Sequence, residues 1–257
     1  MQLDKRGAGV KWRLIPYKTE KAVWNPAWDE SILEHVQRGL SPPTLRFYGW
    51  DPSAVVIGYF QCLADEVDLA LAKEKGVHVV RRITGGGACF LEEDLTYSVI
   101  APESCFSRDI LKSYEEICSC LVRALKKVGI EAVFRPINDV WVGEKKISGS
   151  AQTRKKGAIL HHGTLLWKVD PERMFSFLKV DKVKLSDKFI RSVKKSVTSI
   201  LDEKPGVKKE EVLEAMKQAF LEGKEFELGT FSESEKKRAE ELVKSKYEQH
   251  AWNHLRV

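Results

Sequence analysis

Residues 81–88 read RRITGGGA, so three consecutive glycines directly follow a segment rich in β-branched residues. That segment, 77–83, predicts a strand, and residues 95–101 predict another strand after the loop. Glycine costs conformational entropy and adds no side-chain packing, so Gly85, Gly86 and Gly87 require a reason. We expect close approach of a ligand, because backbone N–H groups in such a loop can cradle a phosphate or a carboxylate. A tight bulged turn is the alternative.

Two arginines precede the glycine loop. Arg81 and Arg82 point to opposite faces of the predicted strand, because side chains alternate along a strand. One of the two could supply a bidentate contact to an anion held by the loop. The alternative is an arginine at the surface that contacts no ligand.

A second region combines a lysine pair with small residues at 145–151. Lys146 and Ser148 share one face of a predicted strand, and Lys145 lies on the other face. An inward-facing lysine beside small residues leaves space for a ligand, so this strand is a candidate wall of a binding site.

Candidate metal-binding side chains flank that strand. Asp139 could hold Mg²⁺ through its carboxylate. His161 and His162 are adjacent, so they face opposite sides and do not easily bind one metal together. Each histidine taken alone is more often structural than a ligand.

The remaining segments up to residue 170 predict a strand-rich core with helices between the strands. A helix begins at Asn25-Pro26 and ends at Gly39, and a second helix begins at Ser107 and ends at Gly129. Because helices and strands do not alternate strictly, we expect an α+β fold with a mixed sheet. The other predicted elements are a hairpin of the strands 45–50 and 54–60, a helix over 65–75, and strands over 132–142, 146–151 and 159–169.

From about residue 171 the pattern becomes helical and rich in lysine and glutamate. Ser232 and Glu235 form a capping box for a helix that reaches about Tyr247. Residues 204–209 are the expected flexible connection. The length of 257 residues suits one domain, so we expect residues 1–257 to form a single domain with a helical C-terminal part.

Composition and charge exclude several classes of protein. With 43% hydrophobic and 31% charged residues, the composition is that of an ordinary globular protein, and no apolar stretch is long enough to span a bilayer. Residues 1–10 lack the apolar core of a signal peptide, so we expect a cytoplasmic protein without a membrane partner. A net charge of +6 fits an anionic metabolite or an acidic protein, while the absence of an RNP motif argues against nucleic acid. Five cysteines without a CxxC pair indicate neither a disulfide framework nor a zinc site.

Several ordered motifs together resemble the lipoate–protein ligase A family, which belongs with the biotin ligases and the octanoyltransferases. Compatible spacing of several motifs is far more specific than one glycine loop. The resemblance is strong over residues 25–170 and weaker up to Trp252-Asn253. It implies an α+β lipoate/biotin ligase-like catalytic domain, in which helices flank a mixed β-sheet core. The motifs lie at 44–61, 81–88, 95–98, 138–139, 146–151 and 162–166.

The resemblance implies a lipoate–protein ligase that uses ATP and Mg²⁺. Lipoate and MgATP give lipoyl-adenylate and pyrophosphate, and a carrier lysine then attacks the mixed anhydride to form an amide. Cationic and N–H donors must offset the repulsion between the anionic carboxylate and phosphate. Lys146 matches the catalytic lysine of the family, and Asp139 is the implied metal ligand. The implied substrate- and nucleotide-binding residues are Arg81, Arg82, Gly85, Gly86, Gly87, Ala88, Asn138, Ser148, Gly149, Ser150, Ala151, His162, Gly163 and Thr164.

The implied partners are apo lipoyl domains of 2-oxoacid dehydrogenases or the glycine cleavage H protein. Many ligases of the family carry a C-terminal accessory domain, whereas this sequence reaches Val257 about where that domain begins. We therefore expect either a separate accessory subunit or an incomplete ATP-dependent reaction. Many relatives also have a histidine–aspartate pair after the glycine loop, where this chain has Leu91-Glu92.

Two alternatives remain open. A cysteine-dependent octanoyltransferase branch of the same fold needs no ATP, because a thiolate takes the acyl chain from acyl carrier protein. Its nucleophile lies just before the segment equivalent to 136–140, where this chain has Val133 and no cysteine, which favours the ligase. Cys89, beside the glycine loop, is the thiol that supports the transferase. The second alternative is a non-catalytic lipoate-binding module, against which Lys146 and Asp139 argue.

Overall fold

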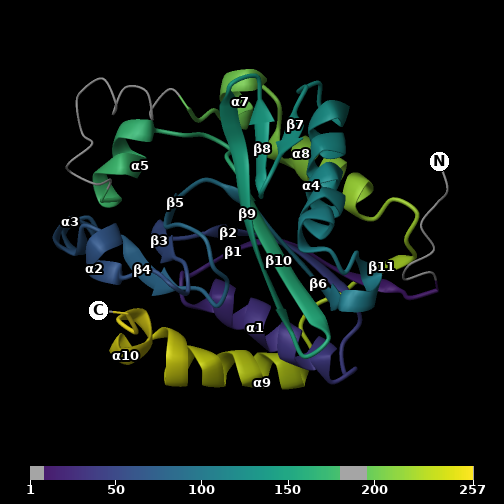
Figure 1. The fold of residues 1–257 in the computed structure, drawn as a ribbon, viewed down its shortest axis with the longest axis horizontal. Helices are drawn as coiled ribbons and strands as arrows, with labels where there is room; N and C mark the ends of the chain where they lie inside the picture. Colours follow the sequence, from purple (N-terminus) through teal and green to yellow (C-terminus); the bar gives the residue numbers. More distant parts are fainter. Residues whose placement is uncertain (1–8, 180–195, 257) are drawn as a thin grey trace.

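The computed structural model describes residues 9–179 and 196–256, and an eight-stranded mixed sheet forms its centre, as Figure 1 shows. The strands are β1 (Trp12–Glu20), β2 (Thr44–Trp50), β6 (Leu95–Pro102), β7 (Val133–Arg135), β8 (Asp139–Val142), β9 (Lys145–Lys155), β10 (Ala158–Leu165) and β11 (Phe226–Leu228). Their order is β11-β1-β2-β6-β10-β9-β8-β7. β1 runs parallel to β2 and β11, whereas the other neighbours are antiparallel. The predicted α+β class with a mixed sheet is confirmed.

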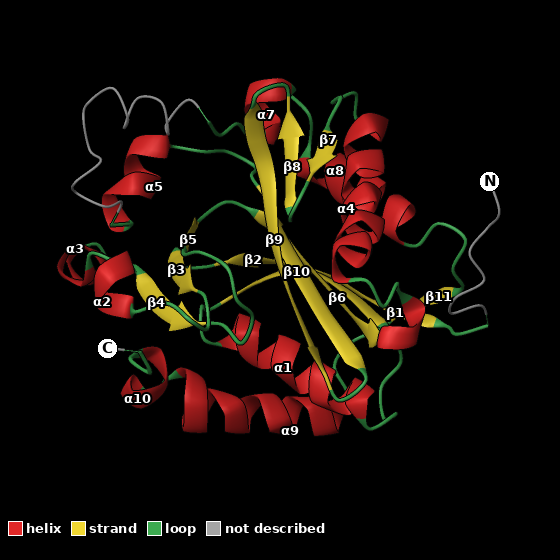
Figure 2. Ribbon diagram, viewed as in Figure 1, coloured by secondary structure: helices red, strands yellow, loops and turns green. Residues whose placement is uncertain are grey.

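Helices cover both faces of the large sheet (Figure 2). On one face, α1 (Trp24–Gln37) packs on α9 (Glu233–Leu242) and on β6 and β10. On the other face, α4 (Ile110–Lys127) and α8 (Lys209–Phe220) enclose the largest apolar cluster. Ile117, Leu121 and Leu125 of α4 are buried there, so the apolar stripe seen in the sequence is core. The helix is capped by Asp109, two residues after the predicted Ser107.

A smaller three-stranded sheet carries the glycine loop. It consists of β3 (Ala54–Ile57), β4 (His78–Arg81) and β5 (Cys89–Leu91), in the order β4-β3-β5. The glycine loop joins β4 to β5. The short helices α2 (Leu63–Glu66), α3 (Leu69–Glu74) and α5 (Pro171–Phe177) lie beside this sheet, and Phe177 stacks on Phe90 at 4.9 Å between ring centroids. The loop therefore projects from a small buried core of its own.

Three predicted elements differ from the structure. The hairpin over 45–60 is wrong: β2 already has β1 and β6 on its two edges, so β3 pairs in the smaller sheet instead. The helix over 65–75 is interrupted, because Val67 pairs with Leu178 and Asp68 caps a new helix. The strand over 132–142 is two antiparallel strands, β7 and β8.

The C-terminal part contains helices, as predicted, and one strand that was missed. The capping box of Ser232 and Glu235 is confirmed, and Arg13 donates to both carboxylate oxygens of the buried Glu235, at 2.6 and 2.8 Å. β11 escaped prediction because its three residues are all exposed and show no alternation. The other elements are the 3-10 helix η1 (Glu103–Cys105), α7 (Ile200–Glu203), the π-helix η3 (Val243–Tyr247) and α10 (His250–Asn253).

Across the described ranges, no helix has the combination of length and apolar character that crossing a membrane requires.

Asp94 is a buried carboxyl in the turn that leads into β6. Burial raises its pKa to about 7 from an ordinary value of 3.8, and backbone hydrogen bonds from Glu92 and Trp167 offset only part of that cost. Between these two pKa values the folded state binds the additional proton. The contribution of Asp94 to stability is therefore most favourable at acidic pH, falls as pH rises through the folded pKa, and stays constant above it.

Asp94→Asn is expected to raise the free energy of unfolding at about pH 8, by up to roughly 4 kcal/mol, because the amide carries no charge to bury. At about pH 4.5 the difference should shrink to about 1 kcal/mol, because this pH lies less than one unit above the ordinary pKa of an aspartate. Urea titrations at the two pH values measure both differences. Glu93→Gln, one residue away and exposed, is the matched control and should show no such pH dependence. Equal stabilisation at both pH values would contradict the assignment.

Candidate active site

A cavity of about 180 Å³ opens where the glycine loop, the beginning of α1 and strands β9 and β10 meet. The β9–β10 pair aligns His162 with Ala151 and Thr164 with Gly149, so the second predicted region faces the first across this cavity. Arg81, Gly85, Asp139 and Ser148 are not part of its wall. The predicted residues that line it are Arg82, Gly86, Gly87, Ala88, Asn138, Lys146, Gly149, Ser150, Ala151, His162, Gly163 and Thr164.

Arg82 shapes the glycine loop from within. Its guanidinium donates to the carbonyl oxygens of Gly85, at 2.7 Å, and Gly87, at 2.8 Å, and to that of Val56 at 3.0 Å. Gly86 adopts a φ of 88°, a conformation that favours glycine. The positive charge of Arg82 thus lies at the cavity wall, while its N–H groups hold the loop.

Arg81 faces away from the cavity, in agreement with the prediction that the two arginines lie on opposite faces. Its side chain is 0% exposed, and its guanidinium donates to backbone carbonyl oxygens, including those of Gly58 and Asn253. Arg81 therefore holds backbone segments together. The expectation that it contacts the substrate is corrected, because its N–H groups point to these carbonyls and it does not reach the cavity wall.

Lys146 and Asp139 form an ion pair at the edge of the cavity, with Nζ 2.7 Å from Oδ1. The two side chains are 36% and 23% exposed, so solvent reaches both. Asp139 on β8 pairs with Gly149 on β9, where a Cβ atom would lie 2.8 Å from Lys146 Nζ. The backbone of Lys146 is fixed as well, because its N–H donates to Ser196 and its carbonyl accepts from Thr198. A glycine at 149 therefore leaves the space that the lysine occupies.

Asp139 offers a single carboxylate to a metal. Among the residues that the structure describes, no three His, Cys, Asp or Glu side chains come together as a metal site. Mg²⁺ in phosphate-transfer sites is usually held by one or two carboxylates together with substrate phosphates. Asp139 fits such an ion only when phosphate oxygens complete the coordination, and its metal role stays a prediction.

Asn138 lines the cavity, whereas Ser148 does not. Asn138 Nδ2 donates to the carbonyl of Ser150 at 2.5 Å, and Ser150 Oγ donates back to the carbonyl of Asn138 at 3.0 Å, so Asn138 ties the β7–β8 turn to β9. Ser148 does not share the cavity face with Lys146 as predicted. The pairing of β8 with β9 shifts between these two residues, and this irregularity breaks strict alternation.

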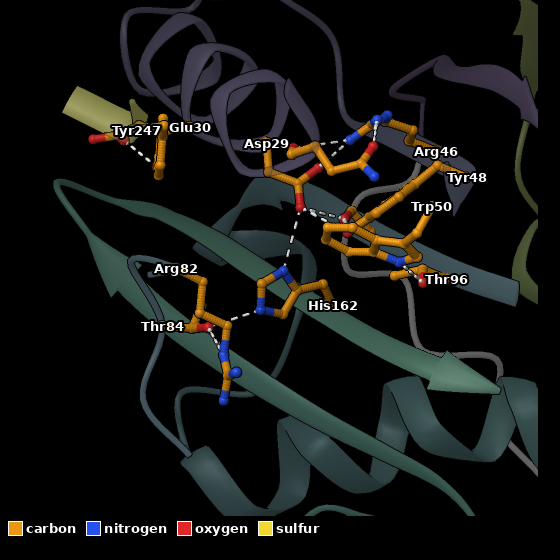
Figure 3. Close-up of polar contacts among 12 residues, drawn as sticks. Asp29, Glu30, Arg46, Tyr48, Trp50, Arg82, Thr84, Thr96, His162 and Tyr247 are labelled. Atoms are coloured by element: carbon orange, nitrogen blue, oxygen red, sulfur yellow. Dashed lines mark hydrogen bonds and ion pairs between the residues drawn. The ribbon is translucent and has the colours of Figure 1, made fainter. Parts of the chain in front are cut away.

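A buried carboxylate supports the cavity from α1, as Figure 3 shows. Asp29 Oδ2 accepts hydrogen bonds from Ser98 at 2.7 Å and Tyr48 at 3.1 Å, and Oδ1 forms an ion pair with Arg46 at 2.9 Å. Although burial raises the pKa of Asp29, the hydrogen bond from His162 and the charge of Arg46 hold it below the ordinary value. Asp29 therefore stays ionised and anchors His162.

His162 connects this carboxylate to the glycine loop (Figure 3). Its Nδ1 lies 3.2 Å from Asp29 Oδ2, and its Nε2 lies 2.7 Å from Thr84 Oγ1. Thr84 Oγ1 already accepts from Arg82 Nε at 3.0 Å, so its own proton can point to His162. A neutral imidazole with the proton on Nδ1 satisfies every contact in this chain.

His161 lies on the other face of β10, as predicted. It is fully buried, and its ring lies 6.0 Å from that of Tyr97. Burial, with a smaller contribution from His162, lowers its pKa to about 3. His161 is therefore a neutral core residue.

Part of the cavity wall is apolar. Trp50, Val56 and Leu91 line it, and Trp50 Nε1 donates to Thr96 Oγ1 at 2.8 Å, so the indole presents no free donor there. Leu91 contributes an aliphatic side chain to this wall. The cavity therefore combines the charged side chains of Arg82 and Lys146 with an apolar wall suited to an alkyl chain.

Comparison with known proteins agrees with this arrangement. The lipoyl protein ligase A/B catalytic domain family matches residues 21–221. The chain belongs to this family. The resemblance seen in the sequence and the predicted lipoate/biotin ligase-like fold are thereby confirmed.

Individual relatives of this ligase A/B family member carry two different names. The octanoyltransferase LipM of Kyrpidia tusciae is 36% identical over 95% of this chain and 98% of that protein. A bi-partite lipoate protein ligase of Thermoplasma acidophilum, solved as part of a lipoylation system with its E2 lipoyl domain, is 34% identical. It covers 96% of this chain and 98% of its own, with a TM-score of 0.87.

A lipoate-protein ligase A solved with bound ATP is 31% identical over 95% of this chain and 98% of its own, with a TM-score of 0.82. The chain is thus an enzyme of the lipoate ligase and octanoyltransferase family. The names of the curated relatives favour the octanoyltransferase over the predicted ligase.

Part of the cavity wall was not predicted from the sequence. Asp29, Tyr48, Trp50 and Thr96 come from α1, β2 and β6, outside the two regions singled out. Asp29 had a detectable signal, because it is a carboxylate within the apolar helical stripe that contains Ile32. The other three residues lie within the motifs 44–61 and 95–98, but they were not predicted as site residues.

Proposed function

We propose that this protein, acting as one catalytic domain, attaches a lipoyl-type acyl group to a lysine of a lipoyl domain after activating the acyl carboxylate with MgATP. The Lys146–Asp139 pair carries this proposal, because it places a solvent-accessible cation at the edge of a cavity whose wall is partly apolar. The likeness to a ligase solved with ATP supports it.

The residues of this chain divide the work as follows. The wall formed by Trp50, Val56 and Leu91 takes the acyl chain and excludes water from it. Lys146 supplies positive charge where the acyl carboxylate meets a phosphate, and the glycine loop adds backbone N–H donors. Asp139 orients Lys146, and it would be the protein ligand of Mg²⁺, which supplies charge neutralisation to the phosphates when bound.

Asp139→Asn is expected to slow acyl activation by about tenfold to a hundredfold, because the amide loses the charge that holds Lys146 and attracts a hard cation. Transfer from pre-formed lipoyl-adenylate should be impaired much less. Pyrophosphate release across a Mg²⁺ titration measures the first step, and intact mass of the carrier domain measures the second. If pre-formed adenylate restores nothing, Asp139 acts in the second step or in folding.

The second candidate function is transfer of octanoyl from acyl carrier protein, as in the enzymes whose name the curated relatives carry. The structure adds one supporting observation: Cys89 is exposed and lines the cavity. In this reaction its thiolate would attack the thioester carbonyl of octanoyl-acyl carrier protein and release the thiol of acyl carrier protein. The lysine of the lipoyl domain would then attack the acyl thioester on Cys89, form the amide and release the Cys89 thiol.

Other described thiols are poorly suited to that chemistry. Burial raises the pKa of Cys118 to about 12, and burial also raises the pKa values of Cys120 and Cys105. Cys62 does not line the cavity. Val133, where the transferase nucleophile was expected, is 53% exposed on β7 and lies outside the cavity wall. Cys89 is therefore the thiol on which the alternative depends.

Cys89→Ser is expected to retain ATP-dependent ligation at the natural order of magnitude, because the hydroxyl preserves size and the proposed reaction uses no thiolate. Incubation with octanoyl-acyl carrier protein should leave no acyl adduct on the natural protein, as read by intact mass. An adduct that maps to Cys89 and disappears in the serine variant would establish the transferase instead.

One assay separates the two candidates directly. The protein is incubated with an apo E2 lipoyl domain and either lipoate plus MgATP or octanoyl-acyl carrier protein alone, and the carrier mass is recorded. We expect modification in the first reaction only. The H protein is the second acceptor to test. Because the Thermoplasma acidophilum relative is bi-partite, we also propose an accessory subunit, which the assay tests by addition. The expected cytoplasmic location belongs to the same proposal.

A further inference from the structure

Two residues at the C-terminal end of α10 complete the free edge of β4. The side-chain Oδ1 of Asn253 accepts a hydrogen bond from the backbone N–H of Arg81 at 2.8 Å. The backbone carbonyl of Asn253 accepts a second one from Arg81 Nη2, also at 2.8 Å. The carbonyl of Trp252 accepts from Arg81 Nε at 3.1 Å, and Trp252 Nε1 donates to the carbonyl of Arg81 at 2.9 Å. These contacts fix the backbone and the guanidinium of Arg81 at the same time.

The remaining N–H groups of Arg81 donate hydrogen bonds to the backbone of one turn, residues 58–61. Nη1 donates to the carbonyl oxygens of Gly58 at 3.0 Å, Tyr59 at 3.0 Å and Gln61 at 2.7 Å. Among the described residues, no carboxylate forms an ion pair with this buried guanidinium. Burying a charge without a counter-ion is costly, so the carbonyl oxygens must be held close to it. Arg81 therefore dictates the shape of residues 58–61.

That turn is in direct contact with the glycine loop. The N–H of Tyr59 donates to the carbonyl of Thr84 at 2.8 Å. A Cβ atom on Gly58 would lie 2.0 Å from the carbonyl oxygen of Gly86, so the two backbones already touch. A shift of residues 58–61 therefore has to move Gly86, which lines the cavity.

The other end of the same C-terminal segment is anchored to α1. Tyr247 donates to Glu30 at 2.5 Å (Figure 3), and Lys246 Nζ lies 2.8 Å from the same carboxylate. Asn253 Nδ2 donates to the carbonyl of Tyr247 at 2.9 Å. Glu30 directly follows Asp29, the anchor of His162. Residues 246–253 thus connect both sides of the cavity, although Trp252 and Asn253 do not line it.

We infer that Trp252 and Asn253 are positioning residues for the active site: through Arg81 they fix the turn 58–61, and through that turn they fix the glycine loop. The inference concerns the cavity of the proposed function and depends on that function only for the ligand used as a probe.

Hydrogen exchange read by mass spectrometry tests the inference without any ligand. In Asn253→Ala and Arg81→Lys, amide exchange in the segments 57–61 and 83–89 is expected to rise by about tenfold or more, because the turn and the loop are released together. His250→Ala, an exposed position on the same helix, is the matched control and should leave both segments unchanged. Asn253→Asp retains an acceptor for the Arg81 N–H but loses the donor to the carbonyl of Tyr247, so it should restore part of the protection.

Binding of lipoate, measured by calorimetry, tests the consequence for the site. We expect the dissociation constant to rise by about tenfold in Asn253→Ala and to return towards the natural value in Asn253→Asp. Faster exchange confined to 78–81 and 250–253, with 83–89 unchanged, would overturn the inference. If the natural protein binds no lipoate, the proposed function fails, while the exchange experiment still decides the positioning role.

Discussion

Lys146→Ala is expected to lower the rate of acyl activation by about 10²–10³-fold while leaving the fold intact, because one well-placed charged donor contributes this much to a polar transition state. Its Nζ is at the cavity mouth, 2.7 Å from Asp139, and not in the apolar core. Removing it should therefore cost catalysis and little stability. Pyrophosphate release with lipoate and MgATP measures the first effect, and thermal unfolding measures the second.

Lys145→Ala is the matched control for this experiment. Lys145 precedes Lys146 on β9 but is exposed and absent from the cavity wall, so its loss should change the rate by less than about twofold. Similar losses of rate in the two variants would mean that the positive charge of the surface, and not the position of Lys146, supports acyl activation. A folded Lys146→Ala variant with near-normal pyrophosphate release would remove Lys146 from the mechanism.

Gly58→Ala is expected to reduce activity by at least about a hundredfold, since small displacements of a site can cost this much. The new Cβ would lie 2.0 Å from the carbonyl oxygen of Gly86 and 3.0 Å from its carbon, both backbone atoms that no rotamer change can move. The glycine loop or β3 must therefore shift. Overpacking of this kind also costs typically about 1–3 kcal/mol of stability. Steady-state rates and urea unfolding measure the two effects.

Gly87→Ala is the control for the glycine loop itself. Among the described residues, apart from Gly87 and its two chain neighbours, no atom lies within 4 Å of the position that its Cβ would take, so the variant should fold as the natural protein does. Residue 87 also lines the cavity. Any loss of activity in this variant therefore reports on the space left for the ligand and not on the loop conformation. If Gly58→Ala binds lipoate with unchanged affinity, the contact between the turn and the loop does not shape the cavity.

Much of the candidate site could be predicted because its signals are local. A run of three glycines, a lysine before small residues and two adjacent histidines each constrain the backbone within a few positions. The structure brings Gly86, Lys146 and His162 to one cavity, as the motifs indicated. The α+β class followed similarly from periodicities that extend over single elements.

The parts that escaped prediction depend on contacts between distant segments. The hairpin over 45–60 was locally plausible, and it failed because β1 and β6 occupy both edges of β2. Arg81 was indistinguishable from Arg82 as a ligand residue until the carbonyl oxygens around it were placed. Asp29 gained its role from His162, which is far away in sequence. Tertiary hydrogen bonds of this kind leave little trace in one sequence.

The hydrogen bonds of Arg81 to Trp252 and Asn253 also bear on how the protein is made. The partners are 171 and 172 positions apart, and Arg13 and Glu235 are 222 apart. A chain emerging from a ribosome presents β3 and β4 long before residues 252–253 exist to cover the free edge of β4. Such non-local closure slows folding and leaves strand edges open in the meantime. Each molecule would therefore acquire a competent catalytic pocket only after residues 252–253 have been synthesised.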